Sequence, residues 1–317
     1  MFSRFLCHGL ICGLLLAGCA TAPSVPQAAS EIAPTVAPAP QRAIVHARGT
    51  TLVPREPQRV VVLTNEATDI VLALGLTPAG AVQSWGADPY YDYIAVDMAG
   101  VPTVGDELQP NLEAIVALQP DLIIGSQVRQ GAVYEQLSVI APTIFSETLG
   151  ETWQENLRLY GQALNREAAA TQLLAEWENR VATQRQRFAQ QGTQVSLVRF
   201  LPDTARVYLQ DSFPGQIIAA VGLQRPPSQT AIGFAQEVSF EEIPQMDADV
   251  LFYFTYADAE EASHRTAQPW LSHPLWQQLA VVQAGRAYAV SDVVWTTGGG
   301  IQAAHLLLDD LERYLAQ

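Results

Sequence analysis

The chain has 317 residues, of which 49% are hydrophobic and 15% charged, so it can form one large domain or two lobes and is not globally disordered. Acidic residues outnumber basic ones 32 to 17, and the formal charge of −15 argues against nucleic acid as a partner. All seventeen basic residues are Arg, and the absence of Lys excludes Schiff-base chemistry and lysine-dependent phosphate sites.

Residues 1–19 have the pattern of a signal peptide. Arg4 precedes a short apolar run at 10–16, which then ends in a lipobox-like Leu-Ala-Gly-Cys19. We therefore expect lipidation of Cys19 at the mature N-terminus and a chain held on the periplasmic side of the cell envelope. A plain secretory signal with a chance cysteine is the alternative. Cleavage would remove Cys7 and Cys12, which excludes cysteine nucleophiles and thiolate metal sites from the mature body.

Residues 20–57 are rich in Ala, Pro, Ser, Thr and Gln, a composition that buries little surface. We expect this range to be a tether that holds the folded body away from a membrane. At most one edge strand is expected in it, at Ile44–Val53.

From residue 58 onward, short β-branched runs alternate with segments of helical spacing, which predicts βαβ units and a parallel sheet. The expected strands of the first half are Arg59–Leu63, Pro78–Val82, Pro120–Ile124 and Thr143–Phe145. The expected helices between them are Glu66–Leu74, Asn111–Leu118 and Ala132–Ser138.

Two helices are expected next, at 152–164 and 167–190, and the second would span roughly 36 Å, enough to cross from one lobe to another. The α/β pattern then restarts. The expected strands of the second half are Val195–Phe200, Val207–Gln210, Val250–Thr255 and Ala287–Ser291, and the expected helices are Gly215–Val221, Gln268–Leu279 and Ile301–Leu315.

The two halves contain a short internal repeat. Residues 111–124 align without gaps on residues 239–252, with three identities: Glu113 with Glu241, Ile115 with Ile243, and Asp121 with Asp249. Each copy has the pattern of a helix that leads into a strand. The repeat indicates two lobes related by a pseudo-twofold axis, although shared helix–strand patterning could produce so short a match by chance.

The sequence offers little for catalysis or metal binding. His264, His273 and His305 lie far apart and lack metal-ligand spacing, and G-x-S-x-G is absent. The Gly298–Gly300 run could cradle a phosphate, but a turn that caps the last helix is the favoured interpretation.

Aromatic and Arg residues follow the predicted strands, at the edge where doubly wound sheets bind ligands. Trp85 and Arg129 do so in the first half, and Arg199 and Trp295 in the second. One such residue alone would be ordinary packing. Together they predict a cleft in which Arg binds anionic oxygens and indole rings form flat walls.

The chain resembles the substrate-binding lipoproteins of ABC importers that carry ferric siderophores, a class III periplasmic binding protein family with cobalamin- and haem-binding relatives. The resemblance runs from about Arg59 to Leu315. Its carriers are Arg59-Val-Val-Val-Leu, Leu72-Ala-Leu-Gly75, Val104-Gly105, Asn111-Leu-Glu113, Pro120-Asp-Leu-Ile123, Ser212-Phe-Pro-Gly215, Ser239-Phe-Glu-Glu-Ile243, Trp270-Leu271 with Leu279, and Gly285-Arg286.

This resemblance implies an α/β fold of two Rossmann-like lobes with mainly parallel sheets, joined by a single long helix, with the ligand in the cleft between them. It places the N-terminal lobe at 58–166, the connecting helix at 167–191 and the C-terminal lobe at 192–317. It also implies one permease-docking Glu per lobe, here Glu113 and Glu241, although either could simply complement a helix dipole. For ligand binding it points to Trp85, Arg129, Arg199, Tyr208 and Trp295.

We therefore expect a monomeric binding protein, not an enzyme, that delivers a ferric siderophore of hydroxamate or citrate-hydroxamate type to ABC permease subunits in the inner membrane. Neither a covalent cofactor nor a metal bound by the protein itself is expected, because the chelator holds the iron. A cobalamin or haem binder of the same fold is the first alternative. An enzyme or a structural envelope protein on a similar scaffold is the second.

Overall fold

The computed structural model describes residues 40–188, 192–201, 204–256 and 260–315. The expected signal peptide, Cys19 and most of the expected tether lie outside these residues. The last part of the range expected as tether is instead a hairpin of β1 (Gln41–His46) and β2 (Gly49–Pro54), paired antiparallel. Ile44 and Val53 are buried in the core, and this apolar pair explains why residues 41–54 fold rather than act as a tether.

The first sheet is parallel throughout, with strand order β4-β3-β5-β6. Its strands are β3 (Val60–Val62), β4 (Gly80–Ala81), β5 (Leu122–Ser126) and β6 (Thr143–Ser146). All four are buried along their whole length, as expected for a sheet covered on both faces. The accompanying helices are α1 (Asn65–Ala73), α2 (Leu112–Ala117), α3 (Gln127–Gln130), η1 (Gly131–Val133), α4 (Tyr134–Ile140) and α5 (Trp153–Ala163).

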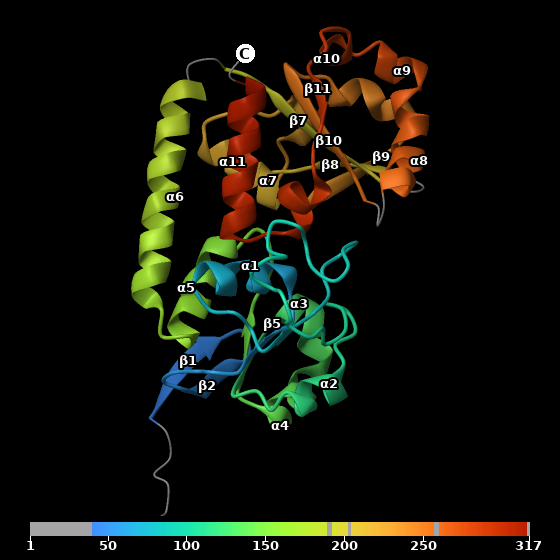
Figure 1. The fold of residues 1–317 in the computed structure, drawn as a ribbon. Coiled ribbons are helices and arrows are strands. Elements are labelled where there is room, and N and C mark those ends of the chain that lie inside the picture. The colour runs from blue at the N-terminus through green and yellow to red at the C-terminus, as the bar shows by residue number, and fades with distance from the viewer. Residues whose placement is uncertain (1–39, 189–191, 202–203, 257–259, 316–317) are drawn as a thin grey trace, which may run out of the picture. The chain divides into compact units, whose positions relative to one another are not determined.

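The long helix α6 (Glu167–Phe188) follows the first sheet in the chain and precedes the second (Figure 1). It packs against α5 and α11 (Ile301–Leu315). Its buried stripe has helical spacing and consists of Ala170, Leu174, Trp177, Val181, Gln184 and Phe188.

The second sheet is mixed, with strand order β11-β10-β7-β8-β9. Its strands are β7 (Val195–Phe200), β8 (Ala205–Tyr208), β9 (Ala235–Val238), β10 (Val250–Thr255) and β11 (Ala287–Ala289). The three strands β7, β10 and β11 are parallel, whereas β8 pairs antiparallel with both of its neighbours, β7 and β9. The helical segments are α7 (Phe213–Ala220), η2 (Pro227–Gln229), η3 (Phe240–Met246), α8 (Glu260–Leu271), α9 (Pro274–Gln277), α10 (Ala280–Gln283), the π-helical turn η4 (Val293–Thr297) and α11. The fold class expected from the sequence, α/β with mainly parallel sheets, is confirmed.

The internal repeat has equivalent contacts in both halves. Asp121 accepts hydrogen bonds from the backbone N–H groups of Gln58 and Arg59, just before β3. Asp249 accepts one from the backbone of Gln194, just before β7. Each aspartate thus ties its own strand to the start of the neighbouring central strand, which supports the interpretation of residues 111–124 and 239–252 as copies of one unit.

The single helix expected at Gln268–Leu279 is divided. His273 caps a new short helix by accepting a hydrogen bond from the Leu275 backbone at 3.2 Å, and Pro274 occupies its first position. Nowhere in the described ranges is there a helix both long and apolar enough to span a membrane.

Candidate functional site

A cavity of about 140 Å³ is lined by residues from both halves of the chain, some in the strands and some in the segments that follow them. It receives Trp85 and Arg129 from the first half, and Arg199 and Tyr208 from the second. Four of the five ligand residues predicted from the sequence are therefore brought together. The remaining lining residues are Glu66, Glu107, Leu149, Gly150, Phe213, Pro214, Phe234, Thr296, Thr297 and Gly299.

Arg129 reaches the cavity because α3 begins directly after β5, so that its side chain lies at the carboxyl edge of the parallel sheet. Its Nε lies 3.2 Å from Oε2 of the buried Glu107. Glu107 is held in turn by the backbone and side-chain amides of Asn65, at 2.6 and 2.8 Å. Arg129 is thus a half-exposed cation, and the buried carboxylate of Glu107 fixes the orientation of its side chain.

Arg199 enters from β7 and is 9% exposed. Its guanidinium donates to Asp292 at 2.6 Å and to the Tyr208 hydroxyl at 3.2 Å, and it lies 5.0 Å from the ring centre of Tyr256. Burial opposes the charge, but Asp292 and Tyr208 outweigh it and raise the pKa of Arg199, so the residue stays cationic. Its Nε is buried and has no hydrogen-bond partner.

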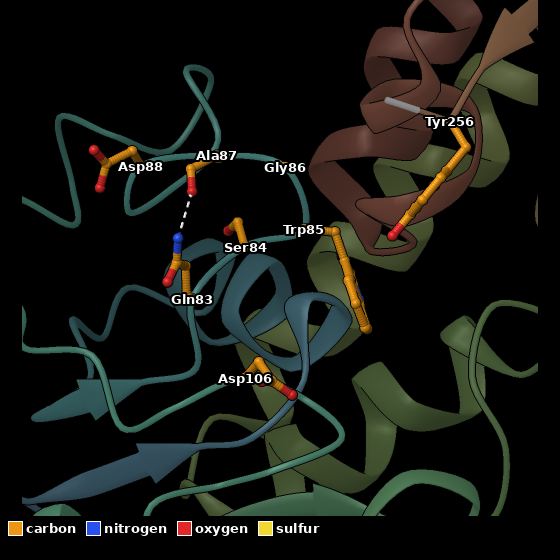
Figure 2. A pocket seen from close by; sticks show the side chains of 8 residues that line it. All are labelled: Gln83, Ser84, Trp85, Gly86, Ala87, Asp88, Asp106 and Tyr256. Atoms are coloured by element: carbon orange, nitrogen blue, oxygen red, sulfur yellow. Dashed lines mark hydrogen bonds between the residues drawn. The ribbon is translucent and has the colours of Figure 1, made fainter. Parts of the chain in front are cut away.

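Trp85 lines this cavity and also an adjoining one of about 400 Å³. Figure 2 shows the second cavity, where the Tyr256 side chain, from the segment after β10, extends toward the Trp85 side. The other lining residues are Gln83, Ser84, Gly86, Ala87, Asp88 and Asp106. Trp85 therefore lies between the two cavities, which together we call the cleft.

The expectation for Trp295 requires correction. Its side chain is fully buried, packs 4.6 Å from Phe252 between ring centres, and donates its indole N–H to Asp310 at 2.8 Å. It lies in η4, where the π-helical turn directs the indole into the core while the next two residues, Thr296 and Thr297, line the cavity. Trp295 is therefore a core residue that supports the wall of the cleft.

Glu66 is a cavity residue that the sequence reasoning did not select. It is 3% exposed, and its carboxyl accepts hydrogen bonds from the Gly150 backbone and from the Asn156 side chain, both at 2.6 Å. Burial raises the pKa of Glu66 to about 8, with smaller contributions in the same direction from Glu107 and Asp69. Its position directly after the first buried strand was the available signal.

Glu113 and Glu241 are both exposed and lie away from the cavity. Each precedes by two residues a fully buried isoleucine, Ile115 or Ile243, so the two carboxylates occupy equivalent positions in the repeat. A backbone hydrogen bond and the Ser239 hydroxyl lower the pKa of Glu241. Glu241 also borders a surface hollow of about 400 Å³ beside Phe240.

Two further observations concern metal binding and phosphate binding. Within the described part of the chain, no three His, Cys, Asp or Glu side chains gather in a group able to hold a metal ion. The Gly298–Gly300 turn precedes α11, but the first free N–H groups of that helix are occupied by Asp69, which accepts from Gln302 and Ala303 at 2.9 and 3.0 Å. A phosphate cradle at this turn is therefore excluded, and the interpretation as a helix-capping turn is retained.

Comparison with known proteins agrees with this architecture. Residues 60–293 match the family model described as periplasmic binding protein. The probable siderophore-binding lipoprotein YfiY of Bacillus subtilis is 48% identical over 283 residues, which are 86% of this chain and 87% of that protein. The achromobactin-binding periplasmic protein of Dickeya dadantii is 38% identical, over 81% of this chain and 86% of that protein.

Among solved structures, Staphylococcus aureus SirA complexed with staphyloferrin B superposes with a TM-score of 0.80 and 33% identity, over 87% of this chain and 98% of SirA. The family match at residues 60–293 spans the strands of both sheets, from β3 to β11. These matches confirm the resemblance to substrate-binding lipoproteins of siderophore importers. The chain belongs to the periplasmic binding protein family.

Proposed function

We propose that this chain is the solute-binding component of an ABC importer, which captures a ferric siderophore in the cleft and delivers it to the permease. The observation that carries this proposal is the convergence of Arg129 and Arg199, from two different sheets, on one cavity with aromatic walls. Guanidinium groups bind carboxylate and hydroxamate oxygens, and Trp85 supplies a flat surface for a bulky chelate, while the buried Tyr208 holds Arg199 through its hydroxyl.

Several relatives support a ligand of citrate or hydroxamate type. Relatives are described as binding achromobactin and staphyloferrin B, and others as binding ferric citrate or ferric hydroxamates. A chelate of hydroxamate or citrate-hydroxamate type suits the two arginines, since its outer oxygens are anionic or strongly polar. The iron arrives with its chelator as cargo, so the protein acts by binding rather than by catalysis and requires no covalent cofactor.

Within this function, Trp85, Arg129, Arg199 and Tyr208 contact the ligand, whereas Glu113 and Glu241 face the permease. Exposed carboxylates in equivalent positions on the two halves suit a partner that presents paired basic residues. We also propose that the mature chain is a monomer and that it is anchored through a lipid on Cys19, and a relative described as a lipoprotein supports the anchor.

The proposal is tested by titrating the purified protein with the ferric complexes of staphyloferrin B, achromobactin and citrate and with a ferric trihydroxamate. One class should bind saturably and raise the melting temperature. The R129A/R199A double variant should lose that binding, whereas R206A, whose side chain pairs with Glu237 and does not line the cavity, should retain it.

A further inference from the structure

Glu66 is a buried acid of the cleft that lacks a cation. Its carboxyl is held by two neutral donors, the backbone N–H of Gly150 and the amide of Asn156, and it makes no ion pair with another described residue. The two cavity arginines are each matched by another carboxylate, Arg129 by Glu107 and Arg199 by Asp292. An ionised Glu66 would therefore leave the cavity with a net negative charge.

The carboxyl of Glu66 lies at the cavity surface. Gly150 and Gly299 line the cavity on either side of it. A Cβ added at Gly299 would lie 3.8 Å from Oε2 of Glu66, the same oxygen that accepts from Gly150. Oε2 is thus bordered by two residues without side chains, and the absence of those side chains leaves it within reach of a ligand atom.

The hydrogen bonds from Gly150 and Asn156 favour the ionised form of Glu66, but burial and the neighbouring acids outweigh them. Glu107, from the loop before α2, and Asp69, one turn further along α1, both raise its pKa, as does burial, which is the largest cause. From α5 the neutral phenol of Tyr160 faces it, and the ionisation of Tyr160 is itself opposed by burial and by Glu66. With a pKa of about 8, Glu66 carries a proton at neutral pH.

We propose that Glu66 is a further specificity-determining residue of the cleft, whose neutral carboxyl donates a hydrogen bond from Oε2 to an anionic or carbonyl oxygen of the bound chelate. This proposal rests on the proposed function and names the ligand group that the site selects: an oxygen acceptor rather than an ammonium donor. Ionisation of Glu66 removes the donor and places a like charge beside the ligand, so binding weakens once the proton is lost.

The experiment compares the wild-type protein, E66Q and the control E155Q, which changes an exposed carboxylate on α5 next to Asn156. The panel is the ferric complexes of staphyloferrin B, achromobactin and citrate, and the complex that binds best at pH 7 is carried forward. If only the protonated protein binds, wild-type affinity should fall roughly tenfold between pH 7 and pH 9. E155Q should show the same fall, and E66Q should bind with a flat profile.

Calorimetry on the wild type provides a second measurement that does not depend on the folding of a variant. Titrations at pH 8.5 in two buffers of different ionisation enthalpy should show proton uptake on binding, and E66Q should show none. An E66Q profile that falls like the wild type, or wild-type binding without proton uptake, overturns the role of Glu66 while the proposed function stands. Failure of the wild type to bind any chelate of the panel overturns both.

Discussion

Asp69 in α1 accepts a hydrogen bond from the backbone N–H of Gln302 in α11, which lies 233 residues later in the chain. The same carboxylate accepts from the next N–H of α11 and from the Tyr93 hydroxyl. A Cβ on Gly300 would lie 2.2 Å from Oδ1 of Asp69, so the turn before α11 needs a glycine for this approach. Asp69 of the first helix, α1, thereby caps the last helix, α11.

Replacing Asp69 should therefore destabilise the fold as a whole. D69A leaves two helix N–H groups and a buried phenol without their acceptor, and we expect a loss of about 2–4 kcal/mol in the free energy of unfolding. D69N should lie between D69A and the wild type. Urea unfolding checks this, with the exposed D97N as control, and a D69A midpoint equal to that of the wild type would show that the cap contributes nothing.

The contributions of Asp69 and Glu66 to stability should fall as the pH rises from about 4 to about 8. Burial raises the pKa of Asp69 to about 6 and that of Glu66 to about 8, so the folded state holds protons that the unfolded state has already released. The effect of Asp69 is complete near pH 6, and that of Glu66 continues to about pH 8. Melting temperatures measured across this range should decline in the wild type and decline less above pH 6 in E66Q.

Substitution of Arg199 should lower both the affinity for the ligand and the stability of the fold. R199A removes a cavity cation and leaves Asp292 buried without its partner, so ligand affinity should fall by about tenfold or more and stability should also drop. The double variant R199A/D292A should regain stability but not affinity. Recovery of binding in the double variant would mean that Arg199 only neutralises Asp292.

Substitutions of Trp85 and Trp295 should have clearly different effects on the fluorescence quenching caused by a ferric chelate. Trp85 lines both parts of the cleft, so W85F should lose the larger share of the quenching caused by a ferric chelate. Trp295 is fully buried with its N–H bonded to Asp310, so W295F should retain the quenching and lower the melting temperature. The reverse pattern would place the chelate elsewhere.

Glu113 and Glu241 should be needed for iron transport but not for binding of the chelate. The double variant E113A/E241A should bind the chelate with wild-type affinity, because neither residue lines the cleft. Iron uptake should be lost in cells that depend on this chain. A control double variant, E155A/E178A, changes two exposed carboxylates outside the repeat and should transport normally. Normal uptake by E113A/E241A would refute the docking role.

Local patterns were sufficient to predict much of the fold. The bounds of β7, β10 and α11 agree with the apolar runs and helical spacing of the sequence, because each of these elements buries a continuous face. One edge strand was predicted at Ile44–Val53, where the structure has the hairpin of β1 and β2, because each strand buries only one apolar residue, Ile44 or Val53, and so shows little alternation.

The position of a site residue could be predicted only where the end of a strand fixes the direction of its side chain. Arg129 and Arg199 could be placed because they lie at or just beyond the carboxyl ends of parallel strands. Trp295 could not, since a π-helical turn changes which way successive residues point. The partners of Glu66 and Asp69 lie 84 and 233 residues away, and no local pattern reveals such contacts.

The most direct test of the central claim is a crystal structure of the protein soaked or co-crystallised with the ferric chelate that binds best. We expect iron density in the cleft beside Trp85, with chelate oxygens within hydrogen-bond distance of Arg129 and Arg199. Iron bound outside this cleft, or a protein that binds haem or cobalamin and none of the ferric chelates, would contradict it.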